Sequence, residues 1–203
     1  MTEVRITEFT DPGCPWAYSA EPARRRLDWL YGEELEWRTR MVVLAESRDE
    51  QREKGFTPEK MSASFRDISS DHGMPIDTRV RDDVSATAPA CRAVIAARLN
   101  APGRERQLLR CLRVEYFAGG MLDDGELIRS AATTAGLDPD ELEEWSAQEE
   151  TERCMREDMA AAREPMPAAR ALDHKLANWS GGQRYTCPSY EIERLSDGVK
   201  ISV

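Results

Sequence analysis

The sequence predicts an α/β fold in which one long helical segment separates two groups of strands. The first 44 residues alternate strand, helix and strand, residues 47–164 carry helical periodicity with recognisable caps, and the chain ends in two strand-like segments around a tight turn. A length of 203 residues fits a single domain, or one domain with a large insertion.

The N-terminal elements are bounded by breakers. Residues 4–9 alternate in the manner of a strand, and Pro12-Gly13 ends it. Cys14-Pro15 opens a helix, because proline is tolerated at an early helical position where its missing N–H has no partner to bond. We expect this helix to continue to residue 30, Gly32 to end it, and residues 35–44 to form a second strand.

Helical signals then dominate the middle of the chain. Capping residues and apolar spacing predict six helices: one starting at Thr57-Pro58, then 88–99, 102–117, 124–135, one starting at Asp138, and 149–163. Residues 165–189 are mostly polar and are expected to be loop. Segments 190–195 and 199–203 are strand-like, and Ser196-Asp197-Gly198 between them is a good hairpin turn.

Composition narrows the function classes. The formal net charge of −10 disfavours nucleic-acid binding through a basic surface. Arginines do cluster at Arg24-Arg25-Arg26, but acidic residues follow closely, so a solvated helix face is favoured over a phosphate site. No apolar run has the length of a membrane span, and the first ten residues lack the apolar block of a secretory signal. We therefore expect a cytoplasmic protein.

Cysteine and histidine placement argues against structural disulfides and metal sites. The five cysteines show no paired spacing, and a reducing compartment disfavours disulfides. His72 and His174 belong to no ligand pattern, so no metal is expected.

Cys14 is the leading candidate for chemistry. A thiol at a helix start faces free backbone N–H groups, which stabilise the thiolate that attacks disulfides. The competing interpretation is a small buried hydrophobe, a common role of a single cysteine. Three features together favour the reactive thiol: a strand precedes Cys14, Pro12-Gly13 ends that strand, and Cys14-Pro15 begins a helix.

Several segments together resemble one family. Residues 11–18, Asp-Pro-Gly-Cys-Pro-Trp-Ala-Tyr, resemble the active-site segment of DsbA-like oxidoreductases. They are most similar to the branch of FrnE-like proteins, kappa-class glutathione transferases and 2-hydroxychromene-2-carboxylate isomerases. Further similar segments follow in the same order along the chain: 37–41, 73–76, 87–93, 116–120 and 135–138.

The resemblance implies a thioredoxin-like fold with a large all-helical insertion. Residues 1–45 and 165–203 would form the thioredoxin-like domain, and residues 46–164 the helical subdomain. It also implies a thiol-dependent oxidoreductase with Cys14 as nucleophile. Ala17 stands where dithiol members carry a second cysteine, so this Cys-Pro-Trp-Ala site would be monothiol.

A monothiol site needs an outside partner to complete a cycle. We expect no bound cofactor and a low-molecular-weight thiol, glutathione or an equivalent, as co-substrate, with a small thiol or a protein disulfide as partner. A thiol-dependent transferase or isomerase that holds the cofactor thiolate remains an alternative, as does a non-catalytic binding protein on the same fold. A homodimer also remains open.

Thr186-Cys187-Pro188 resembles the cis-proline segment that faces the reactive cysteine in this fold. If so, Cys187 lies near Cys14 and could resolve a Cys14 adduct or pair with Cys14 directly. The alternative is that Cys187 is a small apolar filler. The resemblance also assigns substrate contacts to four neighbours of the two cysteines: Pro15, Trp16, Tyr18 and Pro188.

Overall fold

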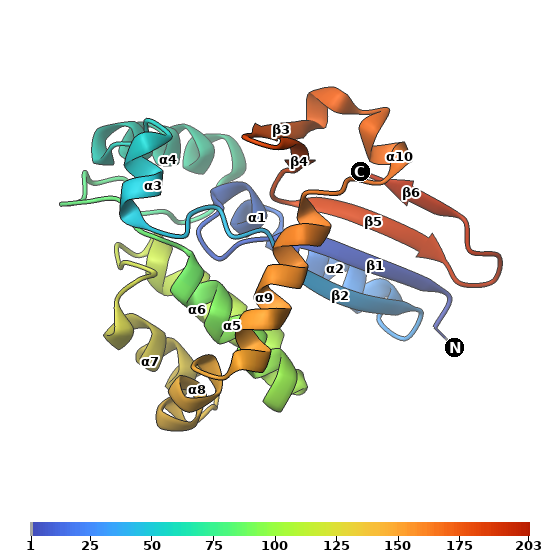
Figure 1. The fold of residues 1–203 in the computed structure, drawn as a ribbon, viewed down its shortest axis with the longest axis horizontal. Coiled ribbons are helices and arrows are strands. Elements are labelled where there is room, and N and C mark those ends of the chain that lie inside the picture. The colour runs from blue at the N-terminus through green and yellow to red at the C-terminus, as the bar shows by residue number, and fades with distance from the viewer. Residues whose placement is uncertain (1) are drawn as a thin grey trace.

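A four-stranded sheet forms one side of the protein (Figure 1). The computed structural model describes residues 2–203, so Met1, the first residue of the predicted domain, lies outside the described residues. In the strand order β2-β1-β5-β6, β1 (Val4–Thr10) is parallel to β2 (Leu35–Met41) and antiparallel to β5 (Ser189–Arg194). Strand β6 (Lys200–Ser202) is antiparallel to β5. The predicted α/β class is confirmed.

The helix that begins after Cys14 is divided in two, which differs from the single helix predicted. Helix α1 (Pro15–Ser19) ends at Ala20, and α2 (Glu21–Tyr31) follows it directly. Pro22, in the first turn of α2, has no N–H to bond the carbonyl of Tyr18, so the ladder of i→i−4 bonds is interrupted. In Figure 1 α2 covers the far face of the sheet.

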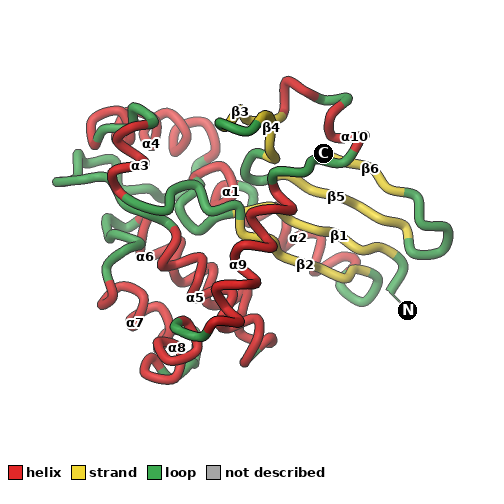
Figure 2. The backbone as a smooth tube through the Cα atoms, in the orientation of Figure 1, coloured by secondary structure: helices red, strands yellow, loops and turns green. Residues whose placement is uncertain are grey.

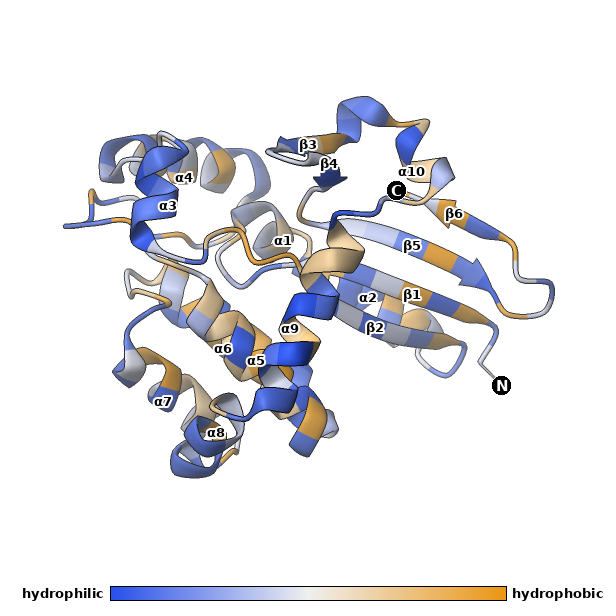
Figure 3. Cartoon of the chain, in the orientation of Figure 1, coloured by the Kyte–Doolittle hydropathy of each residue, from blue (hydrophilic) through white to orange (hydrophobic). Residues whose placement is uncertain are grey.

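Helices fill most of the chain from the end of β2 to residue 162. They are α3 (Arg48–Glu53), α4 (Pro58–His72), α5 (Ala88–Asn100), α6 (Glu105–Phe117), α7 (Gly125–Thr134), α8 (Pro139–Ser146) and α9 (Glu149–Ala162). Figure 2 shows them gathered beside the sheet. Helix α5 has eight buried residues and lies in the interior, whereas the short helix α3 is hydrophilic throughout (Figure 3).

Helix α9 connects the helical block to the sheet, because it packs against both β2 and α5. Its Asp158 is fully buried and accepts hydrogen bonds from Arg40 (2.6 Å), the Met41 backbone N–H (2.9 Å) and Arg98 (2.9 Å). One carboxylate therefore joins β2, α5 and α9. The predicted division at residues 45/46 and 164/165 stays a prediction.

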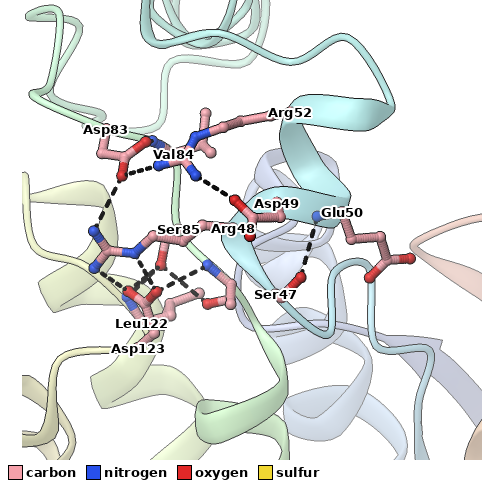
Figure 4. A network of polar contacts seen from close by, with 11 residues as sticks. Ser47, Arg48, Asp49, Glu50, Arg52, Asp83, Val84, Ser85, Leu122 and Asp123 are labelled. Carbon is pink, nitrogen blue, oxygen red and sulfur yellow. Dashed lines mark hydrogen bonds and ion pairs between the residues drawn. The ribbon is translucent and has the colours of Figure 1, made fainter.

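A polar network fixes α3 against two loops (Figure 4). Ser47 caps the helix by accepting from the Glu50 N–H at 3.1 Å. Arg48 donates to Asp123 at 2.6 Å and to Asp83 at 3.2 Å. These bonds hold the segment before α5 and the segment after α6 against the N-terminal end of α3, whose other end borders the cavity described below.

The segment predicted to be loop before the last strands contains more structure than expected. It holds a short helix, α10 (Pro167–Arg170), and a hairpin of β3 (Leu176–Trp179) and β4 (Gly182–Tyr185). The prediction was wrong here because strands of four residues are too short to show a regular alternation of burial. Within residues 2–203, no helix is both long enough and apolar enough to span a membrane.

Candidate active site around Cys14

Cys14 is the residue immediately before α1, and its loop is shaped by Asp11. The Cys14 carbonyl accepts the first helical bond, from the Tyr18 N–H at 3.0 Å. The buried Asp11 carboxylate accepts from the Gly13 N–H at 2.7 Å, the Leu44 N–H at 2.8 Å and the Thr87 hydroxyl at 2.8 Å. Asp11 thus joins the loop before Cys14 to the segment after β2 and to the start of α5.

Bonding to Asp11 also explains why the second strand is shorter than predicted. The sequence predicted a strand to residue 44, but β2 ends at Met41 and Val43 has a positive φ of 54°. Leu44 gives its N–H to Asp11 instead of to a strand partner. This turn brings Leu44 to the wall of the cavity in front of Cys14.

Cys187 lies opposite Cys14, on the connection between β4 and β5. The Cys187–Pro188 peptide bond is cis, and the Cys14 Sγ donates to the Cys187 carbonyl oxygen at 3.1 Å. Both thiols are free and buried in one small apolar cluster that also contains Phe9. The structure therefore brings together the two cysteines selected from the sequence.

The pKa values of the two thiols are shifted in opposite directions. Hydrogen bonding from the Cys187 thiol lowers the pKa of Cys14, helped by the Ala17 N–H and the Arg113 charge, although burial acts against it. Burial, and then the neighbouring Cys14 thiolate, raise the pKa of Cys187 well above its usual value. Cys14 is therefore the thiol of the pair that loses its proton more readily, and the Cys187 thiol can then donate a hydrogen bond to it.

A cavity of about 320 Å³ opens in front of the two cysteines, which is within the range of small-molecule sites. Pro15 and Trp16 line it together with Cys14 and Cys187. Tyr18 and Pro188 are not among its lining residues. Tyr18 instead stacks on Phe117, with ring centroids 4.7 Å apart, inside the helical core.

The cavity walls also contain residues that the sequence did not single out. Lys54, at the end of α3, and Arg184, on β4, line it, and no Asp or Glu does so among the described residues. Lys54 donates to the Leu44 carbonyl at 2.7 Å and pairs with Glu50, whereas Arg184 has no ion pair in the described part of the chain. The other polar and aromatic walls come mainly from α3, α4 and α6: Gln51, Phe56, Phe65 and Tyr116.

Metal ligands do not gather at this site. Within residues 2–203, no three His, Cys, Asp or Glu side chains lie close enough together to hold one ion. The site offers two neighbouring thiols, of which Cys14 loses its proton more readily, inside a cavity lined by Lys54 and Arg184.

Comparisons with known proteins agree with this architecture. A family model described as thioredoxin matches residues 8–167. The ClpXP adapter protein SpxH of Halalkalibacterium halodurans is 27% identical over 167 residues, which are 79% of this chain and 55% of that protein. The chain thus spans about half the length of this curated relative.

Solved structures share the fold at low sequence identity. The cytosolic disulfide reductase DsbM from Pseudomonas aeruginosa superposes with a TM-score of 0.68 at 18% identity, covering 98% of this chain and 88% of that one. The same reductase has also been solved with GSH. A 2-hydroxychromene-2-carboxylate isomerase gives a TM-score of 0.54 at 14% identity, covering 92% and 84% of the two chains.

Proposed function

The chain belongs to the thioredoxin family, with the fold of its DsbA-like members, and on this basis we propose that it is a monothiol thiol-disulfide oxidoreductase with Cys14 as nucleophile. The observation that carries the proposal is the position of Cys14. Its thiol has a lowered pKa, opens into a cavity of about 320 Å³ and faces Cys187, while Ala17 occupies the position of a second motif cysteine.

The first step is thiol-disulfide exchange. The Cys14 thiolate attacks one sulfur of a disulfide R–S–S–R′, the S–S bond breaks, and R′–S⁻ leaves and takes up a proton. Cys14 then carries a mixed disulfide with R–S. A small thiolate R″–S⁻ then attacks the R sulfur of this mixed disulfide, which frees the Cys14 thiolate and forms R–S–S–R″. The net result is release of R′–SH from the substrate disulfide at the expense of one R″–SH.

Cys187 offers a second route for resolution. Its thiolate would attack the Cys14 sulfur, release R–S⁻ and leave a Cys14–Cys187 disulfide, which two outside thiols then reduce while they become a disulfide themselves. Two of the causes that raise the pKa of Cys187 are its hydrogen bond to Cys14 and the Cys14 charge. Both disappear once Cys14 is bonded to R–S, so Cys187 becomes easier to deprotonate at the stage where it is needed.

The walls of the cavity favour an anionic thiol as co-substrate. Lys54 and Arg184 line the cavity, and among the described residues no Asp or Glu side chain lines it. Glutathione has two carboxylates and is of suitable size, and the DsbM reductase with the same fold has been solved with GSH. We propose glutathione, or an equivalent anionic thiol, as the co-substrate.

Intact-mass spectrometry after exposure to oxidised glutathione tests the proposal. We expect one glutathione adduct on Cys14, absent in Cys14→Ser and reversed by excess reduced glutathione. In Cys187→Ser the adduct should persist longer, because the internal route is removed. A protein that forms no adduct and reduces no disulfide would instead fit a non-catalytic binding protein on this fold.

The single motif cysteine also supports a second candidate function. With Ala17 in place of a second cysteine, the site could hold a cofactor thiolate for a transferase or isomerase reaction rather than exchange disulfides. This candidate predicts tight binding of reduced glutathione without any adduct on Cys14. A cytoplasmic location and a homodimer complete the proposal; they are tested by fractionation of cells and by light scattering.

A further inference from the structure

A second cleft, of about 580 Å³, lies between α2 and α6 and shares no lining residue with the Cys14 cavity. Five arginine side chains line it, two from α2 and three from α6: Arg24, Arg25, Arg106, Arg110 and Arg113. Among the described residues, two carboxylates line it with them, Glu21 and Asp28. The cleft is therefore arginine-rich within a chain of formal net charge −10.

Counting the carboxylates in contact with these arginines leaves a positive surplus. Glu21 is shared by Arg110 and Arg113, and Asp28 pairs with Arg106. Glu8, on β1 beneath α2, pairs with Arg24 at 2.5 Å. Five guanidinium groups thus meet three carboxylates, a local excess of two positive charges.

The buried arginines at this cleft are incompletely bonded. Arg24 is only 8% exposed, and its Nε and Nη2 have no hydrogen-bond partner among the described residues, nor has the Nε of the buried Arg113. Burial, and then repulsion by Arg106 and Arg113, lower the pKa of Arg24, while Glu8 opposes this. The solvated helix face predicted for residues 24–26 is thus wrong for Arg24, which lies on the floor of a crowded positive cleft.

Two exposed residues complete the cleft. Arg25 lines it and has no ion pair in the described part of the chain, so its five N–H donors are free for a ligand. Trp29, one turn further along α2, also lines it and is 83% exposed. A guanidinium group binds a phosphoryl group through two parallel hydrogen bonds, and an indole ring offers a flat surface for stacking.

We propose that the cleft between α2 and α6 binds a nucleoside phosphate. Arg25, with the partly exposed Arg106 and Arg110, holds the phosphoryl group, and Trp29 stacks on the base. The inference uses no residue of the Cys14 cavity, so it stands or falls independently of the oxidoreductase proposal. Cys14→Ser should bind the nucleotide as the unchanged protein does.

Titration calorimetry at low salt tests the proposal with three probes: adenosine monophosphate, inorganic phosphate and adenosine. We expect adenosine monophosphate to bind most tightly and adenosine most weakly. Arg25→Gln should weaken both phosphate-bearing probes about tenfold, equal to about 1.4 kcal/mol. Trp29→Ala should weaken adenosine monophosphate to a similar extent and leave inorganic phosphate unchanged.

Arg26→Gln is the matched control, because Arg26 is the exposed neighbour of Arg25 but does not line the cleft. It should leave all three affinities unchanged. Equal weakening by Arg25→Gln and Arg26→Gln would mean diffuse charge attraction and overturn the site. Adenosine binding as well as its phosphate, or no binding of any probe at millimolar concentration, would also overturn it. A Trp29→Ala protein that binds adenosine monophosphate unchanged would overturn the nucleoside part.

Discussion

The sulfur of Cys14 lies 3.1 Å from the carbonyl oxygen of Cys187, although the two residues are 173 positions apart in the chain. The thiol of Cys187 is the largest cause that lowers the pKa of Cys14, and burial is the largest cause that raises the pKa of Cys187. The two thiols are thus coupled, and Cys14 is the one that loses its proton more readily. The geometry around this pair and the buried contacts of α9 can each be tested by substitution or by chemical labelling.

Cys14 should react first with limiting iodoacetamide near neutral pH. Its pKa is lowered, whereas burial raises the pKa of the other four cysteines: Cys91, Cys111, Cys154 and Cys187. Because a lowered pKa means more thiolate at a given pH, the rate for Cys14 should level off at a lower pH than the others. Peptide mapping checks this; faster labelling of Cys154, the least buried of the five, would contradict it.

Cys187→Ala should raise the pKa of Cys14. The Cys187 thiol is the largest cause that lowers it, through a hydrogen bond that alanine cannot make. Cys187→Ser is the matched control, since a hydroxyl can still donate to the thiolate. The pH dependence of alkylation should shift upward in the alanine variant and less in the serine variant. Identical profiles for both variants would show that the hydrogen bond has no effect.

Ala17→Cys should convert the site into a dithiol. Ala17 is buried in the same apolar cluster as Cys14, and its backbone N–H is one of the groups that lower the pKa of Cys14. Mild oxidation should therefore form a disulfide between Cys14 and the introduced thiol and increase reduction of a model disulfide. Ala20→Cys, one turn further along, should form no such bond. Absence of the bond in the first variant would mean that the sulfurs are held apart.

Asp158→Ala should destabilise the fold by about 3–5 kcal/mol, since it leaves Arg40 and Arg98 without their shared buried partner. Glu157→Ala is the neighbouring control, because Glu157 is exposed and pairs only with Arg153 among the described residues; it should cost less than about 1 kcal/mol. Urea denaturation measures both. Equal losses in the two variants would show that α9 is not fastened to the sheet through Asp158.

Local sequence signals predicted those helices and strands whose ends are set by neighbouring residues in the chain. The strand before Pro12-Gly13, the helix start at Cys14-Pro15 and the final hairpin around residues 196–198 all lie where breakers and alternation placed them. The break at Ala20 was also present in the sequence, as Pro22, but the apolar spacing across it suggested one helix. The prediction that Cys187 lies near Cys14 came from the resemblance to DsbA-like proteins and not from the spacing of residues.

The cavity walls could not be predicted in this way. Lys54 and Arg184 are two of 28 basic residues, and neither has a local pattern that distinguishes it. They line one cavity because the fold places the end of α3 and strand β4 on its walls. The same holds for Arg113, whose contacts with Glu21 and with Thr10, at 2.6 Å, join helices and a strand from distant parts of the chain.

The central position of β1 has a consequence for the order in which the protein folds. Its ladder to β5 pairs Val4 with Arg194, across nearly the whole chain, whereas each intervening helix forms through hydrogen bonds between residues four positions apart. Contacts of such long range are slow to form because a large loop must be closed first. Because Cys14 is near the N-terminus, it is synthesised early and has no Cys187 beside it until the chain up to β5 has been made. The nucleophile acquires its environment only when the last strands join the sheet.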